Sequence, residues 1–597
     1  IYPSKGLAAL GSQMYNDSTP EIYLQVNGYF LLDTNDTNGF FRQEIQINDT
    51  ARWSKGRHQI SIGGEYGNGM GDIANDYRAN GYFTFDGSAP FTGNSLADFL
   101  VGKFYSLEQG GGEYKNTRFN IMSFFAQDSI RVTPRLTVDL GLRWDPFFPY
   151  TDLNGKLASY YPGAQSTRFV NAPPGILYAG DPGVPSGGYN KAWGNLGPRV
   201  GFGWDVFGDG STAVRGGYGI YYDHPNTIST NSQVDQAPFA PVVIVNGNSA
   251  NSLSTPWAGT TNPFPITTVP SKNVPFVLPD VAYMYTTGLK NAQLQSWNLT
   301  LERKLPGQFV VRAAYAGSKG THLASLREGN AAVYGPGATS SNIDQRRPLY
   351  PNFSQMTLVE PGDNSSYNSL QVTMERRFQK GFTLLGNYTF AKSIDTSSYN
   401  KQTGQTVTDP FNRAFDRGVS DFDQAHILNL SGLWDVPFKS SNRFAHAVLG
   451  GWQLSGIVTL RSGEPFSVYS GADNASSGVG SDRADLVSSP YLSGGRNRGA
   501  QIAEYLNPAA FASNAPGTFG NSGRNMFFGP GFASTDLSLE KTFHPVERLG
   551  VQFRAEAFNS FNRVNLYNPV NTLGPTFMSI NTAFDPRIFQ FALRLKF

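Results

Sequence analysis

The chain has 597 residues and an almost balanced charge, with 47 Lys plus Arg against 45 Asp plus Glu, so it lacks the basic bias that nucleic acid requires of a partner. It has no cysteine, which excludes disulfides and thiolate metal sites. Its 66 Gly, 44 Phe and 29 Tyr suit strands and turns, and it has no apolar run of about 18 residues of the kind that a membrane-spanning helix needs.

Short alternating segments follow one another along the chain and predict an all-β fold. Residues 23–30 form the first candidate strand, and weak candidates at 81–85 and 96–105 lie in a Gly-rich stretch and are not counted. The later segments are joined by short links, such as the Asp-Gly turn at 209–210, which is a strong hairpin signal. The predicted hairpins pair 41–53 with 57–66, 118–131 with 136–145, 200–206 with 214–222, 297–301 with 309–315, 370–374 with 382–390, 428–436 with 452–460, and 537–543 with 551–555.

Long irregular connections separate these hairpins. Connections of more than about 15 residues are uncommon in compact soluble domains. The alternation of short turns with long connections is typical of outer-membrane barrels, whose short turns are periplasmic and whose long loops are extracellular. Seven hairpins, a terminal strand and residues 23–30 therefore predict a transmembrane antiparallel β-barrel with about 16 strands. The connections span 146–194, 223–293, 317–367, 393–425, 463–533 and 561–587.

The last ten residues are the clearest single strand. One parity is wholly apolar and the other mostly polar, with Gln590, Ala592, Arg594 and Lys596 on the polar side. A half-buried strand of a soluble sandwich would also alternate, but an apolar series that ends on the terminal residue favours a lipid-facing strand that the barrel-assembly machinery receives. The apolar residues of this strand are Phe589, Phe591, Leu593, Leu595 and Phe597.

The same parity assigns charged residues of other strands to the lumen. They could line a substrate path, or they could form pairs between neighbouring strands beneath a plug, and the second interpretation is the more common behaviour of charges on adjacent strands. The predicted lumen residues are Asp139, Arg143, Arg312, Arg554, Glu556, Arg594 and Lys596.

Motifs of catalysis and metal binding are sparse. The sequence lacks H-E-x-x-H, G-x-S-x-G, a Walker loop, and a G-x-G-x-x-G placed between strand and helix, so neither an enzyme nor a bound cofactor is expected. Asp33, Asn35, Asp36 and Glu44 resemble a calcium loop, with Glu44 at position 12, but the glycine falls at position 7 instead of 6. A solvated turn is the alternative interpretation of these four residues.

Several phrases of the sequence point to a known family. They include "FFAQDSIRVTPRLTVDLGLRWDP" from Phe124, "WNLTLERKLPGQFVVRAAYAGSKGTHL" from Trp297, "GGWQLSGIVTLRSGEPFSV" from Gly450 and "DPRIFQFALRLKF" from Asp585. With these phrases in this order, the chain resembles the barrel-forming part of Oar-like TonB-dependent outer-membrane transporters of the acidobacterial type. The resemblance implies a 22-stranded barrel behind an N-terminal sandwich, a TonB box and a plug. None of these three parts is recognisable here, so residues 1–597 are expected to be barrel region alone.

The resemblance also implies a function. We expect a receptor or transporter in the outer membrane of a Gram-negative bacterium, which binds a ligand through its extracellular loops and couples to the TonB system through the missing N-terminal part. Outer-membrane lipid and the assembly machinery are the other expected partners. A surface protein, adhesin or passive pore without energised gating is the first alternative, and a secreted β-rich hydrolase is the second.

Overall fold

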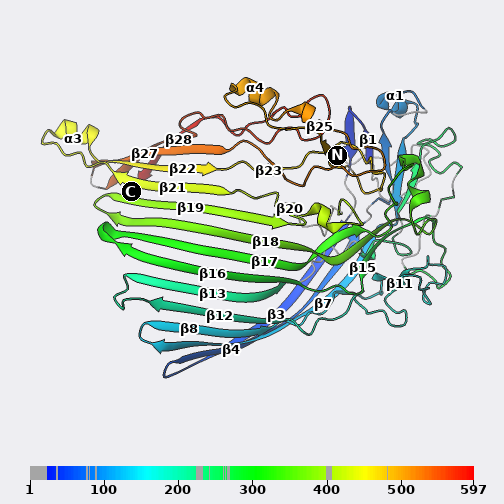
Figure 1. Ribbon diagram of the computed structural model, residues 1–597, viewed down its shortest axis with the longest axis horizontal. Coiled ribbons are helices and arrows are strands. Elements are labelled where there is room, and N and C mark those ends of the chain that lie inside the picture. Colours follow the sequence, from blue (N-terminus) through cyan, green and yellow to red (C-terminus); the bar gives the residue numbers. More distant parts are fainter. Residues whose placement is uncertain are drawn as a thin grey trace.

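The computed structural model describes residues 23–597 apart from 35–37, 76–77, 80, 88–90, 224–232, 241, 260, 263, 265–268, 399–406, 481 and 547. Within this part of the chain, consecutive antiparallel pairs form one long, strongly curved sheet (Figure 1). Its long strands are, in order of pairing, β3 (Asn38–Lys55), β4 (His58–Asn75), β7 (Glu113–Thr133), β8 (Leu136–Trp144), β12 (Leu196–Asp205), β13 (Thr212–Asp223), β16 (Ala292–Leu305), β17 (Phe309–Glu328), β18 (Phe353–Gln379), β19 (Phe382–Asp395), β21 (His426–Asp435), β22 (Trp452–Arg461), β27 (Phe532–Val546), β28 (Leu549–Phe558) and β29 (Ile588–Lys596).

The short turns and the long connections lie at opposite ends of this sheet. In Figure 1 the turns are on the left, together with the C-terminus, and the connections are gathered on the right. All seven predicted hairpins are present with their strands in the expected order. The alternation confirms the prediction of an outer-membrane barrel fold, and the terminal strand ends at the short-turn end, as expected.

The two edge strands run in the same direction. The registers join β3 to β4 and β29 to β28, and both edge strands run from the long connections towards the short turns. Since neighbours in an antiparallel sheet alternate in direction, antiparallel closure between these edges requires an odd number of intervening strands.

The faces of the sheet differ as the alternation predicts. On one face, large apolar side chains are exposed to the surroundings, among them Leu299, Leu370 and Phe591. Their strand neighbours Asn298 and Gln371 lie on the other face, which is polar. Apolar side chains that stay exposed along whole strands are expected where the surrounding solvent is lipid.

The first predicted strand is not part of this ladder. Residues 23–30 divide at a turn, where Gly28 has a φ of +81°, into two short strands of a separate five-stranded sheet among the long connections. The prediction for these residues was therefore wrong, because alternation alone does not reveal which sheet a strand joins. The small sheet has the order β14 (Val242–Asn246), β6 (Ser106–Gly110), β5 (Tyr82–Phe85), β1 (Tyr23–Val26) and β2 (Phe30–Asp33).

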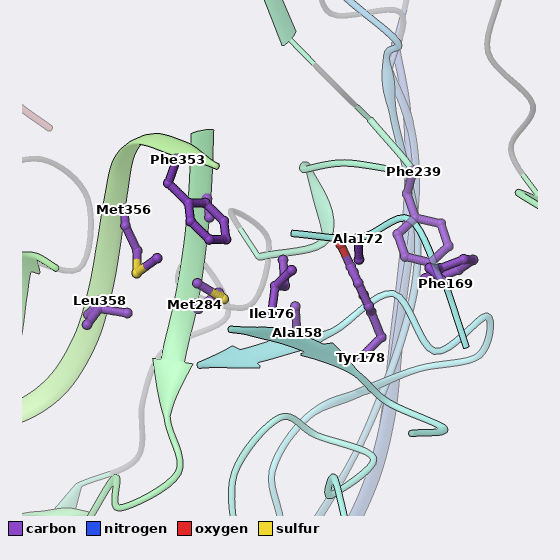
Figure 2. Packing of buried hydrophobic residues seen from close by; sticks show 11 residues of the cluster. Ala158, Phe169, Ala172, Ile176, Tyr178, Phe239, Met284, Phe353, Met356 and Leu358 are labelled. Carbon is purple, nitrogen blue, oxygen red and sulfur yellow. The ribbon is translucent and has the colours of Figure 1, made fainter. Parts of the chain in front are cut away.

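The buried apolar cores lie in the long connections. One core surrounds the small sheet and includes Phe83 and Phe104. A second, shown in Figure 2, packs Tyr178, Phe239 and Phe353 from three different connections or strand ends. Two further cores bring together residues of connections 462–531 and 559–587, and residues of 145–195 with strand ends. We call this set of packed connections the cap.

The remaining elements are short. No helix of the described part is long and apolar enough to cross a membrane. The helices are α1 (Ser95–Leu100), α3 (Arg443–Leu449) and α4 (Arg498–Ala503), with 3-10 helices at Pro306–Gln308, Ser340–Asn342, Asp344–Arg346, Arg413–Asp416 and Pro508–Ala510; the other strands are β9 (Thr151–Asp152), β10 (Ala158–Tyr160), β11 (Ile176–Tyr178), β15 (Asp280–Thr286), β20 (Gly418–Val419), β23 (Pro465–Phe466), β24 (Asp485–Leu486), β25 (Phe511–Ala512) and β26 (Phe527–Phe528).

Candidate functional site

The predicted lumen residues share the polar face of the sheet. Directly paired residues of neighbouring strands point to the same side, so the registers relate each strand to the next. When the registers are followed from β29 to β8, all seven predicted lumen residues lie on one face of the sheet, and Phe589 and Leu593 lie on the other. Which of these side chains would contact a substrate stays a prediction.

Several of these charges are paired. The Arg312 guanidinium donates to Glu302 of the neighbouring strand at 2.9 and 3.1 Å. Arg143 lies 2.6 Å from Asp145 and 3.6 Å from Glu65. The contacts of Arg312 with Glu302 and of Arg143 with Glu65 join different strands, as in the plainer interpretation of the sequence, whereas Arg143 and Asp145 belong to one segment of the chain.

The other predicted lumen residues have different surroundings. Arg554 and Glu556 approach each other along one strand at 3.4 Å. Asp139 lies beside Gly201, and Arg594 lies opposite Gln552 in the register. Lys596 lies opposite Gly550 at the end of the same ladder.

Shallow hollows open along the polar face. One of about 320 Å³ is lined by Asp139, Arg199 and Tyr221. Another, of about 390 Å³, is lined by Asp536 and Glu556 together with apolar residues. A third, of about 400 Å³, lies near the connections and includes Arg42, Glu44 and Phe119. Both charged and apolar residues therefore line the hollows of this face.

Buried ion pairs hold the cap together. Arg483 and Asp416 are each almost fully buried and lie 2.8 Å apart, although they come from different connections. Arg524 lies 2.6 Å from Asp395, which links connection 462–531 to the end of β19. Buried charges persist only when they are paired and hydrogen-bonded, so these contacts fix the connections relative to one another.

One connection folds onto the polar face. Asp235, from the connection between β13 and β16, lies 2.5 Å from Nζ of Lys115, which is a buried residue of β7. The β4 and β7 register places Lys115 on the polar face. Burial raises the pKa of Asp235 to about 7, while the neighbouring Lys115 ammonium acts in the opposite direction.

A second carboxyl of the cap is buried without a cation. Asp280 begins β15, and its Oδ2 atom has no hydrogen-bond partner in the described part of the chain. Burial raises the pKa of Asp280 to about 7. Tyr178 is itself fully buried, and this burial raises the pKa of its hydroxyl, with the nearby Asp280 carboxyl as a lesser cause. The Tyr178 hydroxyl donates a hydrogen bond to the Ala237 carbonyl at 2.7 Å.

The predicted calcium loop remains untested. Asp33 ends β2, and Glu44 lies within the extended strand β3, while Asn35 and Asp36 are outside the described residues. Within the described part, no group of three or more His, Asp or Glu side chains is arranged to hold a metal ion.

The sequence did not reveal the residues of the cap. Asp235, Arg483 and Asp416 were not predicted, because the long connections have no periodic pattern, and Lys115 of β7 lies before the predicted strand 118–131. Their spacing in the chain carries no signal either, since Asp416 and Arg483 are 67 residues apart.

The architecture, with an exposed apolar face, a polar face and all long connections at one end, defines an outer-membrane β-barrel. A family model described as an outer membrane beta barrel domain matches residues 2–590. The chain belongs to this family and is a protein of the outer membrane. A search of curated proteins gave no match.

Solved structures match the chain at low sequence identity. The outer membrane transporter YddB from Escherichia coli matches with a TM-score of 0.50 and 12% identity over 94% of this chain and 54% of its own. The ferripyoverdine receptor of Pseudomonas aeruginosa gives a TM-score of 0.45 with 12% identity over 94% and 49%, and the ferric citrate transporter FecA gives 0.42 with 10% identity over 94% and 55%. The chain therefore spans about half the length of the structures it matches.

Proposed function

We propose that the chain is the barrel of an outer-membrane transporter or receptor, which captures a ligand on the cap and moves it along the polar face. The observation that supports this proposal most is the ion pair of Asp235, from a long connection, with Lys115 on the polar face of the sheet. A connection fastened to the polar face obstructs the mouth, as loops do in plugged barrels, whereas an adhesin needs loops that project outwards.

Energised coupling is the second part of the proposal. The resemblance to Oar-like transporters supports coupling to TonB through a plug and a TonB box outside these residues, and the match to the transporter YddB supports the fold of such a barrel. The family suggests oligosaccharides, peptides or secreted proteins as ligands. No catalytic role is proposed.

The proposal includes further strands between β29 and β3. An odd number is required by the direction of the edges, and seven would bring the fifteen long strands to the 22 that the resemblance implies. Because the chain has no native cysteine, paired cysteine variants give a clean test. A disulfide should form between Ala555→Cys and Phe591→Cys, which are paired in the ladder, and not between Ile45→Cys and Phe591→Cys. Efficient formation of the second bridge in the intact membrane would refute the added strands.

Conductance across planar bilayers tests the gating role of this ion pair. The wild-type barrel, purified together with the proposed further strands, should conduct weakly, and Asp235→Ala should raise the conductance because the connection is no longer fastened to β7. Arg377→Ala, at an exposed ion pair near the short turns, is the matched control. A wild-type chain that conducts as an open pore, with no increase in Asp235→Ala, would instead favour the passive pore.

A further inference from the structure

We propose that the short-turn rim of the apolar face binds the anionic headgroups of glycerophospholipids through a collar of basic side chains, each placed over an aromatic ring. The collar lies near the short-turn ends of four strands, β3, β16, β18 and β27. Its pairs are Lys55 with Trp53 at 5.6 Å, Arg303 with Phe207 at 5.4 Å, Arg376 with Phe382 at 4.9 Å and Lys541 with Phe543 at 4.8 Å, each measured from the cation to the ring centre.

The registers place these cations on the lipid side of the sheet. Arg303 is paired with Val311, Arg376 with Phe309 and Lys541 with Phe553, all on the apolar face. A basic residue on this face is costly at the middle of the membrane and becomes acceptable near the interface. Aromatic rings also prefer the interface, so the pairs mark the level where hydrocarbon gives way to headgroups.

The cations of the collar are largely unmatched by acids. In the described part of the chain, Lys55, Arg303 and Arg376 have no carboxylate within ion-pair distance. Asp128 also belongs to the apolar face, but its Oδ2 atom is 2.6 Å from Nδ1 of His58 and is thereby engaged. A phosphate group at this level would supply the missing negative charge.

Lys541 has a different part in the collar. Its Nζ atom donates to the carbonyls of Ala447 and Val448, at 3.1 Å for Val448, and so holds the end of α3 against the rim. A cation is favourable at a helix C-terminus. Phe444 of α3 is 79% exposed, and Val448 and Leu449 are also exposed. The apolar surface of the strands is therefore continued by α3 at the level of the collar.

The level also selects the class of lipid. Short turns of outer-membrane barrels are periplasmic, so the collar meets the phospholipid leaflet of the membrane. Basic residues close to a lipid surface are attracted to anionic lipids by about 1 kcal/mol each. The inference uses the membrane location of the protein and does not depend on transport.

The test measures which lipid associates preferentially with the full chain in nanodiscs that contain a mixture of phosphatidylcholine and phosphatidylglycerol. Electron paramagnetic resonance of spin-labelled lipids gives the association of each lipid with the protein. We expect the wild type to prefer phosphatidylglycerol and to lose the preference as salt rises. The triple variant Lys55→Gln, Arg303→Gln and Arg376→Gln should lose it, by up to about fivefold for each basic residue that contacts a headgroup.

A matched triple variant removes the same number of charges from the polar face, at Arg312, Arg554 and Arg594. It should keep the preference of the wild type. An unchanged preference in the collar variant, or an equal loss in both triple variants, would overturn the proposal. Heat-modifiable migration confirms insertion, and if the collar triple variant does not insert, Arg303→Gln alone gives the same comparison.

Discussion

Nζ of Lys115 and Oδ2 of Asp235 lie 2.5 Å apart, and they join a connection of the cap to the polar face of the sheet. Lys115 is almost fully buried, so its charge depends on Asp235 and on Glu113, whose Oε2 atom lies 3.6 Å from Nζ. The contact fastens a connection with no periodic pattern to the polar face of β7.

Removing one partner of the Lys115–Asp235 pair should lower the stability of the cap more than removing both partners. Lys115→Met leaves the buried Asp235 carboxyl without its cation, at a cost of about 3–5 kcal/mol for a buried pair. The double variant Lys115→Met and Asp235→Asn removes both charges and should recover much of that loss. Limited proteolysis of connection 224–291 measures how far the connection is released from the polar face. If the double variant is cleaved as rapidly as Lys115→Met, the pairing of the two residues is contradicted.

The stability of the cap near Asp280 should depend on pH. The folded pKa of about 7 lies above the usual 3.8, so the folded state holds a proton that the unfolded state releases between these values. The contribution of Asp280 to stability is therefore greatest below pH 3.8, falls as pH rises towards 7 and then levels, with a total change of up to about 4 kcal/mol.

Asp280→Asn should remove the part of the pH dependence that is due to Asp280, because the amide stays neutral in both states, while the part due to Asp235 remains. We expect similar proteolysis of the cap in wild type and variant below pH 3.8, where the carboxyl is largely protonated in both states, and slower proteolysis of the variant at pH 8. A wild-type chain that is as resistant as the variant at pH 8 would show that the carboxyl is not desolvated.

The buried pair of Arg483 and Asp416 should be essential for the order of the cap but not for the barrel. Arg483 also donates to the carbonyls of Phe415 at 2.7 Å and Ser522 at 2.9 Å, so Arg483→Leu leaves several acceptors unpaired. We expect rapid cleavage within 462–531, with heat-modifiable migration unchanged. Arg377→Leu breaks an exposed pair and should behave as wild type. Equal resistance of the two variants would contradict this role.

The face of β29 should decide whether the chain enters the membrane. Phe591 is exposed on the apolar face, whereas its neighbour Gln590 belongs to the polar face. An Arg on the lipid side costs about 2–4 kcal/mol near the middle of the membrane, so Phe591→Arg should lower the fraction of inserted, heat-modifiable protein. Phe597→Arg should impair assembly in the same way. Gln590→Arg should be tolerated, and equal insertion of the Phe591 and Gln590 variants would count against the assigned faces.

The sequence predicted the strands and their faces because lipid and lumen impose opposite requirements on alternate residues. Leu299 and Leu301 had to be apolar, while Asn298 and Thr300 were free to be polar, and the pattern survives in all seven hairpins. The same pattern misled us at residues 23–30, because a small sheet packed within the cap also buries alternate side chains. The strand count of about 16 included that segment, and the long ladder has fifteen strands.

The cap could not be predicted in this way. Its order rests on contacts between residues far apart in sequence, such as Arg524 with Asp395, 129 residues away. In an irregular segment no alternation of apolar and polar residues distinguishes a buried arginine from an exposed one. The sequence alone therefore does not show which arginines are buried. Three-dimensional packing alone brings Tyr178, Phe239 and Phe353 into one core (Figure 2).

The most direct test of the membrane account is a scan of spin-label accessibility along β16 in bilayers. Single cysteines introduced at 298 to 301 are unique in this chain, which has none of its own. The account predicts that labels at Leu299 and Leu301 collide with dissolved oxygen in the lipid, and that labels at Asn298 and Thr300 are reached by a water-soluble nickel complex. Labels at Leu299 and Leu301 that neither probe reaches would place these side chains in a dry protein core and contradict the account.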